Sequence, residues 1–276
     1  MGNPPPSPAM IHHEDAHSAG RAPAIANGRG LRAMYLLTSS LALFMVAWIL
    51  VLPSSWLMGW WEWHDDVVNR RFLGDSSRFV SPLTVTKYAG HTAVKLTHIL
   101  PGALWAGSIP LQLNSEFRRK HPVLHRRLGY AFALSVMSMA VGIALILHRG
   151  LGYENDYPDL PPPSAVEQSA KHVFFAGNVM FFVYTLLRAV SHAREGNVAL
   201  HQRFIVRHIG SGIWVAVQRV LIGMRGRITP RQLSQLEQRD NFGMMAAIGV
   251  AVAAACSEFT VRVLIPQPRV NKNKND

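Results

Sequence analysis

Apolar residues in this chain occur in long runs that are separated by short, polar and strongly basic stretches. Six of these runs are long enough, at about 20 residues each, to cross the hydrocarbon core of a bilayer as α-helices. They lie at residues 31–57, 91–113, 123–148, 164–190, 198–224 and 242–265. The pattern predicts an all-α fold, a polytopic membrane helix bundle of about six transmembrane helices in contact with the lipid bilayer.

Residues that favour helix starts and bends support these positions. Pro122 suits the first position of the third helix, Ser164 with Glu167 forms a capping-box pattern before the fourth, and Asn197 can cap the fifth. Two prolines lie inside the second span, and each removes a backbone N–H from the helix. We therefore expect Pro101 and Pro110 to bend that span and to free carbonyl groups near its middle.

The same pattern divides the 276 residues into three parts. Residues 1–30 are polar and proline-rich and lack the apolar core of a signal peptide, so we expect a disordered tail. Residues 31–265 form the transmembrane domain, and 266–276 a basic tail. Ionisable residues concentrate in the second to fifth spans, which predicts a central four-helix group at 91–224 between flanking first and sixth helices.

The charge distribution argues for a membrane partner. The chain is 49% hydrophobic and only 16% charged, yet its net charge is +12. Lys and Arg gather in cytoplasmic loops of membrane proteins, so this excess requires no nucleic acid. More of these residues fall on the side of the two termini, which predicts that both are cytoplasmic. The only cysteine, Cys256, excludes an intrachain disulfide and a cysteine-based metal site.

Thirteen histidines are many for this length, and several share a helix face with other ionisable residues. On the second span His98 lies on the face of Lys95, and on the fifth His201 and His208 form one stripe with Arg219. Such a stripe is costly against lipid, so we expect it to face the bundle. We expect His64 and His192 to be solvated.

Two pairs of histidines fall at matched depths. His98 and His172 both lie roughly 10 to 12 Å from the predicted outer boundary, at about 1.5 Å per residue. Near the inner boundary, His125 matches His201 or the deeper His208. Two opposed neutral imidazoles can ligate the iron of a haem b. Arginines near the inner boundary could then hold haem propionates or an anionic reductant, namely Arg126, Arg127, Arg203 and Arg207.

This pairing of the second span with the fourth, and of the third with the fifth, resembles that of transmembrane dihaem b-type cytochromes in topology and histidine placement only. A local resemblance is to predicted membrane proteins that contain the domain of unknown function 2306. Its first part comprises His98, Pro101-Gly102-Ala103-Leu104, Gly107, Pro110, Gln112, Arg118, Arg119 and His125-Arg126-Arg127-Leu128-Gly129-Tyr130. Its second part is His201-Gln202-Arg203-Phe204-Ile205-Val206-Arg207, followed by Arg219.

That family commonly has Trp-Met where this chain has Phe204-Ile205. The resemblance implies a multi-helix membrane protein and supplies no activity.

Two hypotheses for the function therefore stay open. The first is a b-type cytochrome or quinone-linked electron-transfer protein, with a quinone or small redox partner. The alternative is a non-enzymatic lipid or small-molecule carrier, or an assembly factor, in which His98 and the other histidines are structural.

Overall fold

The computed structural model describes residues 28–52 and 56–265. Within this part of the chain all regular structure is helical, which confirms the predicted all-α class. Five helices are long and apolar enough to span a membrane: α1 (Gly28–Leu50), α8 (Pro122–His148), α9 (Ala165–Arg194), α10 (Val198–Ile228) and α11 (Gln235–Phe259), which continues into the π-helical turn η4 (Thr260–Leu264). The protein is a multi-pass membrane protein. The two predicted tails lie outside the described residues, except for residues 28–30.

The second predicted span forms a helix in three consecutive segments. These are α5 (Thr92–Val94), the π-helical turn η2 (Lys95–Ile99) and α6 (Leu100–Leu113). Pro101 has no N–H to donate to the carbonyl of Thr97, four residues earlier. The Ser138 hydroxyl of α8 donates to that carbonyl instead, at 3.0 Å. The bond predicted to be lost at the proline is thus replaced by one between neighbouring helices.

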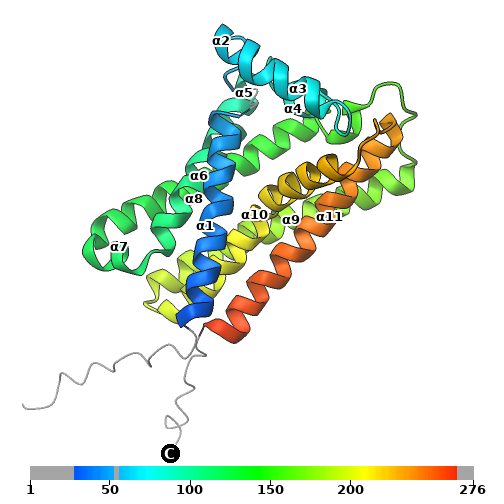
Figure 1. Ribbon diagram of the computed structural model, residues 1–276. Helices are drawn as coiled ribbons and strands as arrows, with labels where there is room; N and C mark the ends of the chain where they lie inside the picture. Colours follow the sequence, from blue (N-terminus) through cyan, green and yellow to red (C-terminus); the bar gives the residue numbers. More distant parts are fainter. Residues whose placement is uncertain (1–27, 53–55, 266–276) are drawn as a thin grey trace, which may run out of the picture.

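Short helices connect the long ones: α2 (Glu62–His64), the π-helical turn η1 (Asp65–Asn69), α3 (Arg70–Ser76), α4 (Leu83–Thr86), α7 (Ser115–Lys120) and the 3-10 turn η3 (Tyr153–Asp156). The segment α2 to α3 crosses one end of the bundle, which we call the α3 end (Figure 1). Trp60, Trp61 and Trp63 are exposed there, as suits side chains at a membrane interface. The opposite end carries α7 and is called the α7 end.

The helices pack as two groups. In one, α6 lies between α1 and α8; in the other, α10 lies between α9 and α11. The groups meet in a core to which all six long helical segments contribute: Ala42, Trp105, Ala106, Ile109, Phe132, Val136, Met139, Phe182, Leu186, Ile209, Ile213, Ala216 and Ala253. The two groups are joined by contacts of α10 and η4 with α1 and by contacts of α8 with α9.

Most helix ends lie within a few residues of their predicted positions. Asn197 accepts from the Leu200 N–H at 3.2 Å and Ser164 from the Glu167 N–H at 3.3 Å, so both residues cap their helices. The Glu167 carboxylate accepts from Lys171 at 2.6 Å, so of the predicted capping box the structure gives the Ser164 half. The largest difference at a helix start is in α11, which begins at Gln235 rather than at 242. A complete capping box formed by Ser234 and Glu237 starts the helix there.

Two predictions of solvated histidines were wrong. His64 is 2% exposed, and its Nε2 bonds the Val51 carbonyl just beyond the end of α1. A carbonyl at a helix end has no partner within the helix, and the imidazole supplies one. His192 is 6% exposed, because it packs against Phe204 and interacts through its ring nitrogens with Arg188 and Glu195.

Candidate functional site

His208 lies at the centre of the bundle and is fully buried. Its Nε2 is 3.0 Å from the indole nitrogen of Trp105, and its Nδ1 is 2.9 Å from the carbonyl of Phe182. An indole N–H can only donate, so Nε2 accepts and Nδ1 carries the hydrogen that it donates to Phe182. Both ring nitrogens of His208 are therefore occupied, and it has no lone pair free for a metal.

The ring of His208 belongs to a central aromatic cluster, which consists of Trp105, Phe132, Phe182 and His208. Phe182 stacks on His208 with centroids 4.3 Å apart, and the Phe132 centroid is 5.2 Å away. The four residues come from α6, α8, α9 and α10, one from each. Gly212 admits this packing, because a Cβ there would lie 2.7 Å from Trp105 and 2.8 Å from Phe182.

His201, near the α7 end of α10, has a different environment. Its Nδ1 donates to the carbonyl of Ala189 on α9 at 2.9 Å. No hydrogen bond to its Nε2 is found among residues 28–52 and 56–265. A histidine whose one ring nitrogen is fixed by a backbone carbonyl, with the other free, has the arrangement typical of metal-ligating histidines.

His125, on α8, lies at the same end of the bundle. Its Nδ1 is buried and has no hydrogen-bond partner. His201 and Arg118 both lie within electrostatic range of it. Gln112 of α6 donates to the His125 backbone carbonyl at 3.1 Å and so fixes the start of α8 against α6. The structure thus brings His125 and His201 to the same region from two different helices.

The predicted outer pair is less closely associated. His98 packs against α8, where its Nδ1 is 3.4 Å from the carbonyl of Met139 and its Cβ lies against Gly142. His172 is exposed, on a part of α9 where most side chains are exposed. Across the described residues we find no hydrogen bond or ring contact between His98 and His172. We also find there no group of three or more side chains that could hold a metal ion.

Two of the basic residues predicted to surround an inner cofactor bond to the last span instead. Arg203 donates to the Val261 carbonyl at 3.1 Å, and Arg207 forms an ion pair with Glu258 at 2.5 Å. Arg262 also pairs with Glu258, at 2.9 Å, as their spacing on one helix predicts. Arg126 is exposed. Of the four predicted arginines, Arg126 and Arg127 are therefore left near His125, and Arg118 lies within electrostatic range of it.

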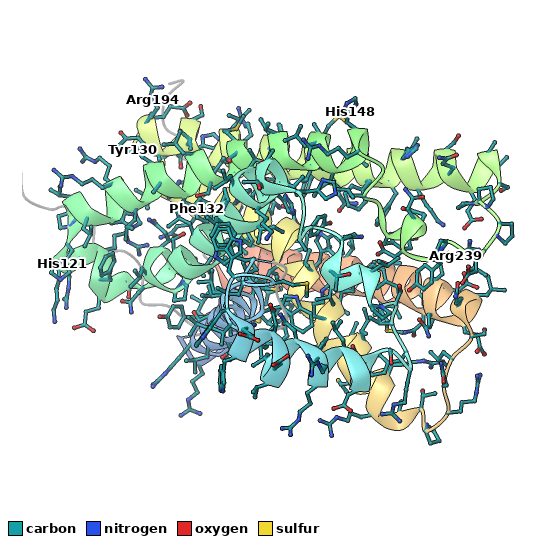
Figure 2. The ribbon with its side chains drawn as sticks, turned by 90° about the horizontal axis from the view of Figure 1, so that it is seen from above. His121, Tyr130, Phe132, His148, Arg194 and Arg239 are labelled. Carbon is teal, nitrogen blue, oxygen red and sulfur yellow. The ribbon has the colours of Figure 1, made fainter. Side chains whose placement is uncertain are left out.

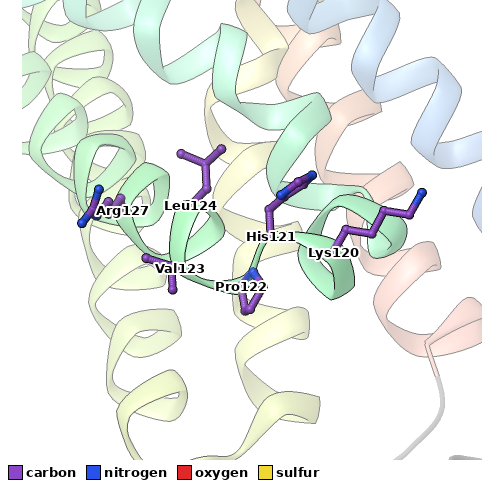
Figure 3. A pocket seen from close by; sticks show the side chains of 6 residues that line it. All are labelled: Lys120, His121, Pro122, Val123, Leu124 and Arg127. Atoms are coloured by element: carbon purple, nitrogen blue, oxygen red, sulfur yellow. The ribbon is translucent and has the colours of Figure 1, made fainter.

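An open, basic pocket of about 320 Å³ lies beside His125 at the α7 end (Figure 3). Its lining residues are Lys120, His121, Pro122, Val123, Leu124 and Arg127. Figure 2 shows His121 and Arg194 toward one end of the molecule and His148 and Arg239 toward the other. The pocket is thus on the side that the sequence predicts to be cytoplasmic, and its charge suits an anionic molecule.

The α3 end holds a buried ion pair that sequence reasoning missed. Lys87 and Asp156 are 2.8 Å apart, and their side chains are only 10% and 3% exposed. Burial lowers the pKa of Lys87 and raises the pKa of Asp156, while their mutual attraction acts against both shifts. Burial also raises the pKa of Tyr88 to about 12. No local signal marks this pair, because its members lie in loops that are far apart in the sequence.

Arg219 lies near this pair, inside α10. Its guanidinium carbon is 5.8 Å from the ring centroid of Trp48 and 5.2 Å from that of Phe242. Its Nη1 donates to Gln218 at 3.2 Å, whereas its Nε is buried and has no partner. Tyr88 and Asp156 lie within electrostatic range of it. Arg219 therefore points between α1 and α11, in agreement with the inward position expected from the sequence.

Comparisons with protein-family models, with curated proteins and with solved structures find no match for this chain.

Proposed function

We propose that this multi-pass membrane protein is a b-type cytochrome, which holds haem b between His125 and His201 and transfers electrons across the membrane. The observation that carries the proposal is the hydrogen bond from His201 Nδ1 to the Ala189 carbonyl at 2.9 Å. Because a carbonyl can only accept, Nδ1 carries a hydrogen, which leaves Nε2 as the ring nitrogen whose lone pair can bind iron in the neutral imidazole.

The donor set fits haem at this position. His125 has a buried Nδ1 without a hydrogen-bond partner, and coordination of this atom to iron would satisfy it. The two imidazoles come from different helices and lie within electrostatic range of each other. Haem b, when bound, supplies reversible one-electron chemistry. The protein itself positions the two histidine ligands and excludes water.

The surrounding charges suit both haem and a reductant. Arg118 and Arg126 lie near His125 and can donate to propionates. Arg203 instead donates to the Val261 carbonyl of η4, and Arg207 forms an ion pair with Glu258 of α11. The basic pocket beside His125 is a candidate entry point for an anionic reductant, which would meet Lys120, His121 and Arg127. The proposal thus places electron entry at the α7 end.

A second haem between His98 and His172 is part of the same proposal. His98 shares one feature with His201, since its Nδ1 faces a backbone carbonyl, that of Met139, on a neighbouring helix. His172 is exposed and therefore accessible to a ligand. His98 and His172 would hold this haem, and a quinone or a small redox partner at the α3 end is the candidate electron acceptor. His208 and Arg219 are not haem ligands in this scheme.

One observation favours the rival function, a non-enzymatic carrier or assembly factor with structural histidines. His208 is bonded through both ring nitrogens and serves packing alone. If His98, His125 and His201 serve the same purpose, the protein binds no haem and its histidines join helices.

A visible spectrum separates the two functions. The full chain is purified in detergent after expression with added haem precursor, and reduced-minus-oxidised spectra and haem content per chain are measured. We expect six-coordinate haem b, with the inner haem lost in His125→Ala and His201→Ala and the full haem content retained in His148→Ala, a control at an exposed position. A folded, colourless wild-type protein would overturn the cytochrome proposal and support the rival. Loss of half the haem in His98→Ala or His172→Ala would support the second site.

A further inference from the structure

Arg219 is a cation inside a membrane helix for which the described residues provide no carboxylate partner. Asp156 is the acid that acts on it electrostatically, but both oxygens of Asp156 already accept from Lys87 Nζ, at 2.8 and 3.2 Å. Lys87 and Arg219 also repel each other. A charge within a membrane span is costly unless it is paired or reaches the interface. Glu154 also acts on Lys87, but no carboxylate among the described residues forms an ion pair with Arg219, so a bound anion would supply its missing direct partner.

The guanidinium group is held in place by aromatic rings. Trp48 of α1 and Phe242 of α11 lie near it at 5.8 and 5.2 Å, and Gln218 accepts one of its hydrogens. Gln218 is fixed in turn, because its amide donates to the Phe242 carbonyl at 3.1 Å. Such contacts orient the group and leave its other N–H donors available. The buried, unpartnered Nε is one of these donors.

Arg219 lies close to the depth at which lipid headgroups begin. At 1.5 Å per residue, the 31 residues of α10 extend for roughly 46 Å, which exceeds the roughly 30 Å of a hydrocarbon core. Arg219 lies roughly 13 Å from the end of α10 at Ile228. If the helix extends equally on both sides, the guanidinium is only a few Å inside the boundary of the core at the α3 end. An anionic group at the interface can therefore reach it.

We propose that Arg219 anchors a binding site for a phosphate group, which enters from the membrane boundary between α1 and α11. The guanidinium donates to two phosphate oxygens, because its planar fork matches their spacing. Tyr88, within electrostatic range of Arg219, provides a hydroxyl for a third contact. The phosphate belongs to an anionic phospholipid or to a soluble molecule, and the site is independent of haem binding.

Thermal unfolding of the full chain in detergent tests this proposal, with Trp fluorescence as a second readout because Trp48 lies beside the site. Three ligands are titrated: phosphatidylglycerol, phosphatidylcholine, whose ammonium group neutralises its phosphate, and inorganic phosphate. We expect at least one of the two anions to give a saturable rise in Tm. Arg219→Gln should weaken its binding about tenfold or more. Arg225→Gln, an exposed arginine on the same helix, should bind within about twofold of wild type.

The outcomes distinguish the sources of the phosphate. A response to phosphatidylglycerol alone identifies a lipid headgroup, and a response to inorganic phosphate identifies a soluble ligand; both support the site. If neither anion changes Tm or fluorescence, or if Arg219→Gln responds like Arg225→Gln, the proposal is overturned. Should Arg219→Gln fail to fold, Arg219→Lys and Phe242→Leu are measured instead. Affinity unchanged in both would overturn the proposal as well.

Discussion

The indole nitrogen of Trp105 donates to Nε2 of His208 across 3.0 Å, in the core between α6 and α10. The bond determines the tautomer of His208 and directs its Nδ1–H to the Phe182 carbonyl on α9. One imidazole thus connects three helices, and Phe132 of α8 packs against the same ring. Because the site is fully buried, the connection depends on both partners being present.

We predict that Trp105→Phe destabilises the protein by about 1–3 kcal/mol, because it leaves His208 Nε2 buried without a donor. Thermal unfolding in detergent measures the change. Trp60→Phe is the matched control, since Trp60 is 68% exposed, and it should leave Tm nearly unchanged. Equal stability of the two variants would contradict the importance of this hydrogen bond.

Gly142→Ala should separate η2 from α8. The new Cβ would lie 2.6 Å from the Cβ of His98 and 2.9 Å from its backbone nitrogen, so the backbone has to move. We expect a cost of about 1–3 kcal/mol in unfolding free energy, as for other overpacked sites. In Gly177→Ala, the control, the added Cβ meets no atom within 4 Å. That variant should be as stable as the wild type or more stable.

Asp156→Asn should be strongly destabilising, by about 3–5 kcal/mol, because it leaves the ammonium of Lys87 buried without its carboxylate. The double variant Lys87→Met with Asp156→Leu removes both charges and should lie much closer to the wild type. Chemical or thermal unfolding of the three proteins tests this. A double variant no more stable than Asp156→Asn would show that the pair matters for more than charge compensation.

The stability of Asp156→Asn has a predictable pH dependence. Burial lowers the pKa of Lys87 below its ordinary value of 10.5, and the loss of Asp156 removes the main effect that opposes this shift. Between the lowered pKa and 10.5 the folded state binds fewer protons than the unfolded state, so stability increases with pH. The deficit of Asp156→Asn should therefore shrink as the pH rises toward 10.5. A deficit that is constant over this range would contradict the burial of a charged Lys87.

The fold was largely predictable because the period and length of apolar runs determine membrane helices. Helix ends were predictable where a residue acts on its own backbone, as Asn197 does at the start of α10. The Ser234 and Glu237 capping box is equally visible in the sequence and gives the true start of α11. It was missed because the apolar run that marks the membrane core begins later than the helix.

The site was predictable only in part, since helix faces do not determine which partner each side chain meets. The stripe on α10 correctly indicates that His208 and Arg219 point inward, yet His208 is used for packing and Arg219 lies between two aromatic rings. The pairing of Lys87 with Asp156 depends on two loops that meet only in the folded protein. Haem ligation by His98, His125, His172 and His201 stays a prediction.

The position of His208 in the chain also has a consequence for biogenesis. During synthesis α6, α8 and α9 enter the membrane before α10, so the indole of Trp105 and the carbonyl of Phe182 have no imidazole to bond until α10 arrives. The core can therefore close only late in translation. A chain truncated before His208 should remain a loosely associated intermediate, accessible to quality-control proteases, even though most of its spans are already inserted.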